Sequence, residues 1–190
     1  MKNVVFLTLI MCGFAASFAQ PTTYKALYKK AYYIAVTHPD SAIHYAKLAI
    51  KATTKAKEKA KAHKLLGYYA ARQGYYSMAI DHYQQAYDLY SKQTEQAKIL
   101  VNLASCYKNI GNTHSAINIA KSAAAKFSVA KDSTNVVNAL YFLGDCYFDQ
   151  LSLRAADSTY KLGIQIAKNI NHPMLSDFYH SYAHYQTKNR

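Results

Sequence analysis

Two histidines, His180 and His184, have the spacing most suggestive of chemistry in this sequence. Residues four apart lie on one face of a helix, where two imidazoles can share a metal ion. In zinc proteases a glutamate general base follows the first histidine, whereas Ser181 stands at that place here. Nothing in the sequence places a third ligand beside the pair. We therefore predict no metal site and interpret both residues as exposed histidines on a terminal helix.

Other reactive side chains are equally sparse. The 10 acidic residues form no paired carboxylates, and the chain has neither a nucleophile motif nor a glycine-rich phosphate loop. Cys106 and Cys146 occupy matching places in successive repeats, described below, so their helix axes should lie about 8–10 Å apart. A disulfide needs Cα atoms within about 7 Å, so we predict two buried, free cysteines. The sequence predicts no enzyme and no cofactor.

Small residues recur along the chain in four triplets with the same internal spacing. Steps of four and then three residues place a triplet on one face of a helix, where small side chains let another helix approach. The first members are separated by 37, 37 and 40 residues, and such a period indicates a repeat protein. The triplets are Ala42, Ala46 and Ala49; Ala79, Tyr83 and Ala86; Ala116, Ala120 and Ala123; and Ala156, Tyr160 and Gly163.

Each triplet belongs to the second of two predicted helices. Gly74 and Gly111 are typical of residues that end a first helix in the left-handed conformation. Pro39 can begin a helix but cannot continue one, whereas residues 149–153 of the fourth unit contain neither device. Each predicted first helix has an equivalent position twelve residues before the first member of its triplet. The residues at this position are Lys30, Gly67, Ala104 and Gly144.

At these positions the sequence resembles the tetratricopeptide repeat, a helix–turn–helix unit that stacks into a right-handed superhelix. The resemblance implies an all-α solenoid of four repeats, at about 23–56, 60–93, 97–130 and 137–170, closed by a terminal helix at 173–187. The family period is about 34 residues, and we expect the extra residues to lie between units, at 91–96 and 129–135. The best match comprises Leu66, Gly67, Ala70, Gly74, Tyr76, Ala79, Tyr83 and Ala86.

In this family the first helices of successive units line a concave groove that binds peptides. The resemblance places basic residues in the middle of the groove and aromatic and acidic residues at its far end. The candidate binding residues are Lys61, Lys64, Tyr68, Arg72, Lys98, Ser105, Lys108, Asn109, Tyr141 and Phe148, with Val101, Asn138, Asp145 and Asp149 beside them.

The chain contains 19 tyrosines and no tryptophan. A tyrosine ring suits a half-buried helix face because its hydroxyl group can reach the surface. By helical spacing, Tyr68 and Tyr141 should face the groove. The tyrosines whose spacing predicts packing roles are Tyr33, Tyr83, Tyr107, Tyr147 and Tyr160.

Residues 1–19 have the pattern of a secretory signal peptide. A lysine near the start precedes an apolar stretch, and a small-residue cleavage site follows, with cleavage expected after Ala19. Removing Lys2 lowers the formal net charge from +13 to +12. The sequence therefore predicts an exported protein, periplasmic or secreted, whose mature domain, residues 20–190, has no membrane span.

These features predict an exported, non-enzymatic protein-interaction module that binds a peptide or protein in its groove. The positive charge suits an acidic partner, although a basic surface alone carries no specificity. We expect no nucleic-acid partner, because the protein is predicted to leave the cytoplasm and contains no nucleic-acid-binding motif.

Two alternatives remain open. The repeats also resemble the sensory region of bacterial envelope regulators, and residues 173–186 look like the first helix of a fifth unit. The chain would then be the front of a longer membrane-bound signalling protein. Alternatively, the basic surface could bind an anionic envelope polymer, with an affinity that falls steeply as salt rises.

Overall fold

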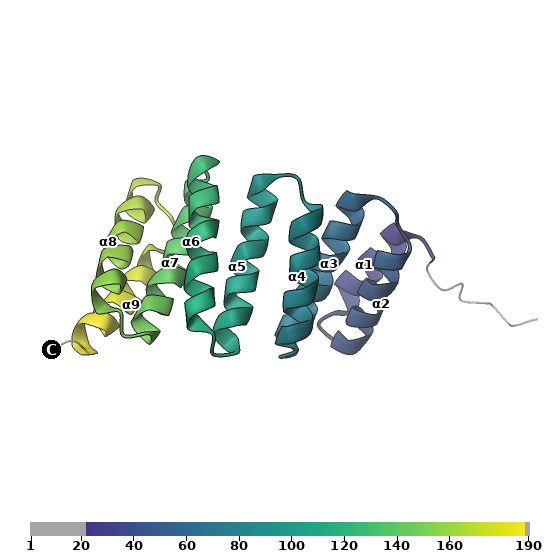
Figure 1. Ribbon diagram of the computed structural model, residues 1–190, viewed down its shortest axis with the longest axis horizontal. Helices are drawn as coiled ribbons and strands as arrows, with labels where there is room; N and C mark the ends of the chain where they lie inside the picture. The colour runs from purple at the N-terminus through teal and green to yellow at the C-terminus, as the bar shows by residue number, and fades with distance from the viewer. Residues whose placement is uncertain (1–21, 189–190) are drawn as a thin grey trace, which may run out of the picture.

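The computed structural model describes residues 22–188, so the predicted signal peptide lies outside the described residues. The described part consists of nine helices and contains no strand (Figure 1). None of these helices is both long and apolar enough to cross a membrane. The helices are α1 Tyr24–Ile34, α2 Pro39–Lys51, α3 Ala56–Arg72, α4 Tyr76–Leu89, α5 Gln93–Asn109, α6 Thr113–Val129, α7 Ser133–Asp149, α8 Leu153–Asn169 and α9 Leu175–Lys188.

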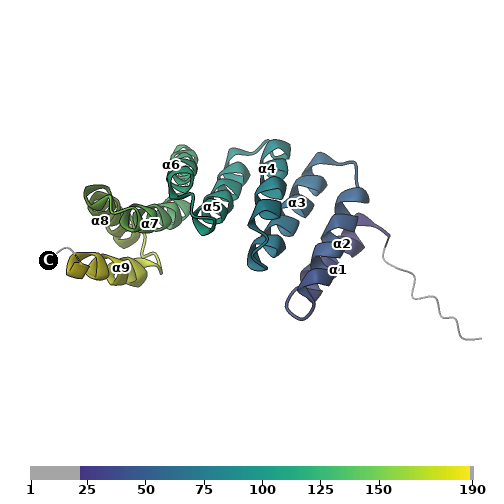
Figure 2. The same ribbon diagram turned by 60° about the horizontal axis from the view of Figure 1, so that its bottom comes forward.

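Helices adjacent in sequence pack side by side and form four hairpins: α1 with α2, α3 with α4, α5 with α6, and α7 with α8. The hairpins stand in a row from one end of the chain to the other, and α9 lies against α8 and α7 (Figures 1 and 2). Helix α1 also contacts α3, α3 contacts α5, and α7 contacts α9. The predicted all-α solenoid of helical hairpins is confirmed.

The turns inside the second, third and fourth hairpins each contain a left-handed residue. Gly74 and Gly111 have φ of 79° and 81°, as the sequence predicts. In the fourth unit Leu151 takes this role with φ of 58°, although side chains disfavour that region. In each case the next residue donates its N–H to a carbonyl in the last turn of the helix, as Ser152 does to Tyr147 at 2.9 Å. This bond satisfies a carbonyl that the helix end leaves unpaired.

Small residues lie where the two helices of a hairpin cross. The first members of all four triplets, Ala42, Ala79, Ala116 and Ala156, are fully buried. Where the middle member is a tyrosine, the facing residue of the first helix is glycine. A methyl group on Gly144 would come within 2.6 Å of the Tyr160 ring, and one on Gly67 within 2.9 Å of the Tyr83 ring.

The extra residues of the long repeats lie only partly between the units: 91–92 and 130–132 connect helices, and the others are helical. Helices α3, α5 and α7 each begin four residues before the predicted start of their units, so 93–96 and 133–135 are helical. The Asp132 side chain caps α7 by accepting a hydrogen bond from the Asn135 N–H at 3.2 Å. The longer period therefore lengthens the first helices.

The buried side chains follow the predictions with one exception. Cys106 and Cys146 are free and buried, as predicted. Tyr83 and Tyr160 are buried, and Tyr107 and Tyr147 are half-buried. The predicted packing role of Tyr33 is wrong, because this side chain is 69% exposed. It lies near the end of the first helix, where no preceding repeat covers it.

Candidate functional site: a groove of three connected pockets

Three pockets follow one another along the first helices of the array. We call them the lysine pocket, the central pocket and the amide pocket, with volumes of about 860, 390 and 250 Å³. Tyr28 and Lys64 line both the lysine and the central pockets, and Tyr68 and Asn102 line both the central and the amide pockets. The three pockets therefore form one groove that extends from α1 to α7.

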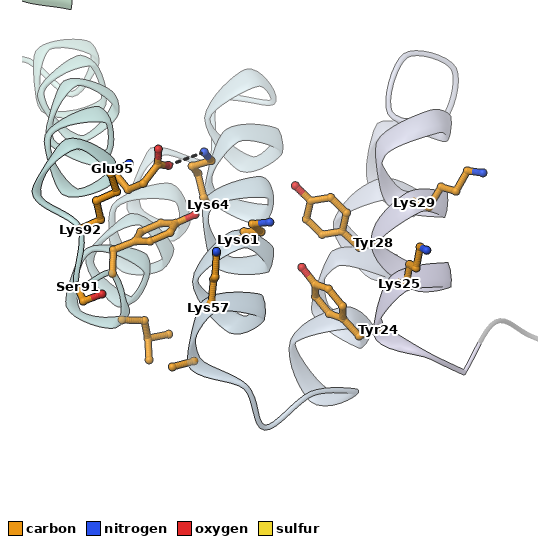
Figure 3. Close-up of a pocket in the computed structure, with 13 residues that line it drawn as sticks. Tyr24, Lys25, Tyr28, Lys29, Lys57, Lys61, Lys64, Ser91, Lys92 and Glu95 are labelled. Atoms are coloured by element: carbon orange, nitrogen blue, oxygen red, sulfur yellow. Dashed lines mark ion pairs between the residues drawn. The ribbon is translucent and has the colours of Figure 1, made fainter. Parts of the chain in front are cut away.

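The lysine pocket lies between α1, α3 and the start of α5 (Figure 3). Tyr24 and Tyr28, one helical turn apart on α1, direct their hydroxyl groups towards α3. Lys61 on α3 faces them across the gap, whereas Lys25 and Lys29 point away from α3 (Figure 3). The wall is completed by Ala56, Lys57, Lys64, Leu89, Tyr90, Ser91, Lys92 and Glu95.

Positive charge dominates the lysine pocket. Six lysines line it, but Glu95 is its single carboxylate. The Glu95 oxygens lie 3.7 Å from the Lys64 Nζ and 3.0 Å from the Lys98 Nζ. Partial burial opposes ionisation of Glu95, but hydrogen bonds and charge from Lys98 and Lys64 outweigh it and lower its pKa. Glu95 is therefore ionised and bound by lysines of two different helices.

The tyrosines of this pocket remain protonated at neutral pH. Burial, together with nearby phenols and Glu58, raises the pKa of Tyr24 to about 12. Burial and the charge of Glu95 raise the pKa of Tyr90 to about 12. Each hydroxyl group is consequently available as a neutral hydrogen-bond donor in a strongly positive environment.

The central pocket is lined mainly by aromatic, apolar and amide side chains. Tyr68 is 45% exposed, and its hydroxyl group accepts a hydrogen bond of 3.3 Å from Arg72 Nη1. The remaining lining residues come from α1, α3, α5, α6 and α7: Tyr28, Tyr32, Lys64, Leu65, Lys98, Val101, Asn102, Phe127, Asn135 and Asn138.

The amide pocket continues past Tyr68 towards the turns of units two and three. Asn109 donates from Nδ2 to the Ser105 carbonyl at 2.8 Å and accepts from the Tyr76 hydroxyl at 3.3 Å. Arg72 and Asn102 also line this pocket. It therefore offers donors and acceptors with little net charge, in contrast to the lysine pocket.

The structure brings most of the sequence-predicted residues together. Seven of them line the three pockets: Lys61, Lys64, Tyr68, Arg72, Lys98, Ser105 and Asn109. Among their predicted neighbours, Val101 and Asn138 line the central pocket.

The other three predicted residues do not line these pockets. Lys108 forms an ion pair of 2.8 Å with Asp149, which raises the Lys108 pKa although burial acts to lower it. Tyr141 packs edge-on against Phe178, with ring centroids 5.2 Å apart. Phe148 packs against His184 at 5.5 Å. Helix α9 thus contacts both aromatic residues at the far end of the groove.

The predicted histidine pair is exposed on α9. Within residues 22–188 no group of three or more histidine, cysteine or acidic side chains is arranged to hold a metal ion.

Several residues of the lysine pocket were not predicted from the sequence. Tyr24 and Tyr28 were missed because the predicted groove residues were taken only from the units that follow the first one. Their four-residue spacing was the available signal, because it places both rings on one face of α1. Glu95 and Lys92 were missed because the segment containing them was assigned to a connection between units.

Comparison with known proteins places the chain by fold alone. No protein-family model matches it, and no curated protein is similar in sequence. Among solved structures, aspartyl phosphate phosphatase F from Bacillus subtilis has a TM-score of 0.75 at 18% identity, covering 82% of this chain and 43% of its own. MamA has a TM-score of 0.67 at 21% identity, covering 80% of this chain and 83% of its own.

A Rap protein complexed with competence and sporulation factor has a TM-score of 0.70 at 21% identity, covering 82% of this chain and 46% of its own. The chain described here thus spans less than half the length of the phosphatase and of this Rap protein. These neighbours are tetratricopeptide-like helical repeat proteins, which supports a fold of the tetratricopeptide type.

Proposed function

We propose that this chain is an exported, non-enzymatic binding module whose groove holds an extended segment of a partner protein. The observation that carries the proposal is the continuous line of three pockets along the first helices. Stacked repeats present such a surface without rearrangement, because each unit is held by its neighbours. An extended segment can therefore contact several units at once.

The structural neighbours support the binding part of this proposal. One of them was solved in complex with competence and sporulation factor, so an array of this fold can hold a partner. Support for export comes from the sequence of residues 1–19, and support for an acidic partner comes from the excess of lysine along the groove.

Selection of displayed random peptides against the purified protein tests the binding function. We expect the selected peptides to bind the wild-type protein and to lose binding to a Lys64→Ala, Tyr68→Ala variant. The matched control is Lys121→Ala, Tyr179→Ala, which removes the same two side-chain types outside the three pockets. Tyr179 and Tyr68 are each 45% exposed, so the two variants lose a similar area of exposed tyrosine surface.

Peptides that bind both variants equally well would contradict the groove hypothesis. If no peptide is selected but polyanions bind, and their affinity falls steeply with salt in both variants alike, the chain would instead be a binder of an anionic envelope polymer.

A second candidate is the sensory front of a longer membrane-bound regulator. Helix α9 favours it, because α9 contacts α7 as α3 contacts α1 and as α5 contacts α3. A further helix could therefore pack beside α9. Sequencing the gene beyond codon 190 tests this candidate: an open frame encoding a hydrophobic span supports it, and an immediate stop codon excludes it.

A further inference from the structure

We propose that the lysine pocket is a subsite for clustered carboxylates of the partner, and that Glu95 occupies part of this subsite until the partner displaces it. This inference rests on the proposed function of the groove. It adds the chemical class of the anchoring residues and the end of the array at which they bind.

The first argument is unbalanced charge. Lys57 and Lys61 on α3, and Lys92 before α5, line the pocket, and none of them forms an ion pair within the part of the chain that the structure describes. A concentration of like charges with low-dielectric walls attracts counter-ions. An acidic segment that enters the pocket would supply the missing negative charge.

The second argument is that Glu95 shows how this pocket holds a carboxylate. Its two oxygens are shared between Lys64 of α3 and Lys98 of α5, so the ion pairs join two neighbouring repeats. Lys64 also marks the junction between the lysine and central pockets. A carboxylate of the partner at this junction would take over these lysines and leave Glu95 facing solvent.

The third argument distinguishes clustered carboxylates from a single small anion. The pocket has a volume of about 860 Å³, which is sufficient for several side chains. Its α1 side includes the Tyr24 and Tyr28 rings, which can pack against the methylene groups of glutamate or against apolar neighbours. Lysines on separate turns of α3 suit several negative charges spread along a peptide.

The fourth argument concerns direction along the array. The polar side chains that line the amide pocket are asparagine, serine and tyrosine with one arginine, whereas the lysine pocket at the other end carries six lysines. The acidic part of the partner is therefore expected over units one and two, and uncharged polar residues over units two and three.

Fluorescence anisotropy with a defined peptide tests the subsite. The probe is a synthetic peptide with a run of glutamates followed by a serine- and asparagine-rich stretch, labelled at the uncharged end. We expect Lys57→Gln, Lys61→Gln to weaken binding roughly three- to tenfold, because exposed charge pairs contribute little individually. The control Lys51→Gln, Lys121→Gln removes the same charge from α2 and α6 and should change affinity less than about twofold.

The displacement of Glu95 is tested by a substitution that should strengthen binding. Glu95→Gln keeps the size of the side chain but frees Lys64 and Lys98, so affinity for the probe should rise about two- to fivefold. Asp88→Asn is the control, since it makes the same change in net charge on the exposed surface of α4. Equal effects of the two substitutions would overturn the role of Glu95.

The remaining outcomes separate the subsite from the groove. Absence of probe binding to the wild-type protein, or equal losses in the pocket and control lysine variants, overturns the subsite. If Tyr68→Ala, Asn102→Ala weakens binding while Lys57→Gln, Lys61→Gln does not, the groove function stands and the subsite fails. Displacement of the probe by inorganic phosphate far below the concentration at which chloride acts would indicate a phosphate site and overturn the assignment to carboxylates.

Discussion

At the scale of single residues, side-chain sizes are matched where the two helices of units two, three and four cross. Gly144 faces Tyr160 and Gly67 faces Tyr83, each with no room for a methyl group. In the third unit the corresponding residues are Ala104 and Ala120, and both are buried. The equivalent crossing point is therefore filled by a glycine and a tyrosine in units two and four, and by two alanines in unit three.

A double-mutant cycle at Gly144 and Tyr160 tests this complementarity. Gly144→Ala should destabilise the protein by about 1–3 kcal/mol, because the added methyl group overpacks the crossing. Tyr160→Ala should cost about 3–5 kcal/mol through the cavity that it leaves. The double variant should lose less than the sum of the two, as measured by urea unfolding, because the alanine pair then resembles that of the third unit.

The matched control is Gly144→Ala combined with Ile117→Ala, a buried residue of the neighbouring α6. The losses of unfolding free energy caused by these two substitutions should be closer to additive than those of the Gly144 and Tyr160 pair. Additivity in the Gly144 and Tyr160 cycle would show that the two side chains do not compete for space.

At the scale of helix pairs, two histidines join α3 to α4. The Nδ1 atoms of His63 and His82 lie 3.1 Å apart, so one ring must donate and the other must accept. Burial and the positive charges of His82 and Lys59 lower the pKa of His63 to about 4. Burial and Lys47 also lower the pKa of His82, although Asp81 opposes them. Both rings are therefore neutral in the folded protein at neutral pH.

Stability should consequently fall as pH decreases from about 7 to about 4. In this window the unfolded chain, with a histidine pKa near 6.5, binds protons that folded His63 does not bind. Urea unfolding at several pH values in this window should show that the free energy of unfolding depends less on pH in His63→Gln than in the wild type. The control is His44→Gln on the exposed side of α2, in which the free energy of unfolding should depend on pH as in the wild type. An unchanged slope in His63→Gln would contradict the assignment.

Phe178 is the most deeply buried side chain that joins helix α9 to the array. Phe178 is fully buried, packs on Gly163, and lies edge-on to Tyr141 at 5.2 Å. Phe178→Ala should cost about 3–5 kcal/mol and increase hydrogen exchange in α9 and α8 while leaving α1 to α4 protected. Tyr179→Ala, the adjacent and half-exposed residue, is the control and should change exchange little. A uniform loss of protection along the chain would show that the units are not independent.

The sequence was sufficient to predict the hairpins but not their lengths. The triplets and the turn glycines define the order of the helices, because their spacing directly reflects helical geometry. The starts of α5 and α7 were misplaced because 91–96 and 129–135 contain polar residues that suit both turns and exposed helix starts. Leu151 could not be predicted in a left-handed turn, since the surrounding structure imposes that conformation against its own preference.

At the scale of the whole molecule, the groove was predictable in the middle of the array and not at its ends. Seven predicted residues line the pockets because the first-helix register is uniform through units two and three. Tyr141 and Phe148 are instead packed against α9, which is a tertiary contact that a repeat pattern does not contain. The tyrosines of α1 join the groove because the first unit stacks on the second as the later units do.

The proposed export of the protein leads to a prediction about its N-terminus. Cleavage after Ala19 should give material that begins at Gln20, which intact-mass spectrometry of the exported protein can measure. Replacing Ala19 with a bulky residue should prevent cleavage at that site, because the processing site requires small side chains. Detection of Met1 in exported wild-type material would contradict this processing.

The serial packing of the helices also determines how the protein can fold. Closely packed helices are adjacent or next but one in chain order, so their contacts join residues that are near each other in sequence. Chains with such low contact order fold quickly, because little loop entropy is lost before contacts form. The α1–α2 hairpin and the α3 helix that packs on it can therefore assemble before α9 has left the ribosome or a translocation channel. If the units fold in this order, the only apolar surface left exposed is the face of the last folded unit on which the next unit will pack.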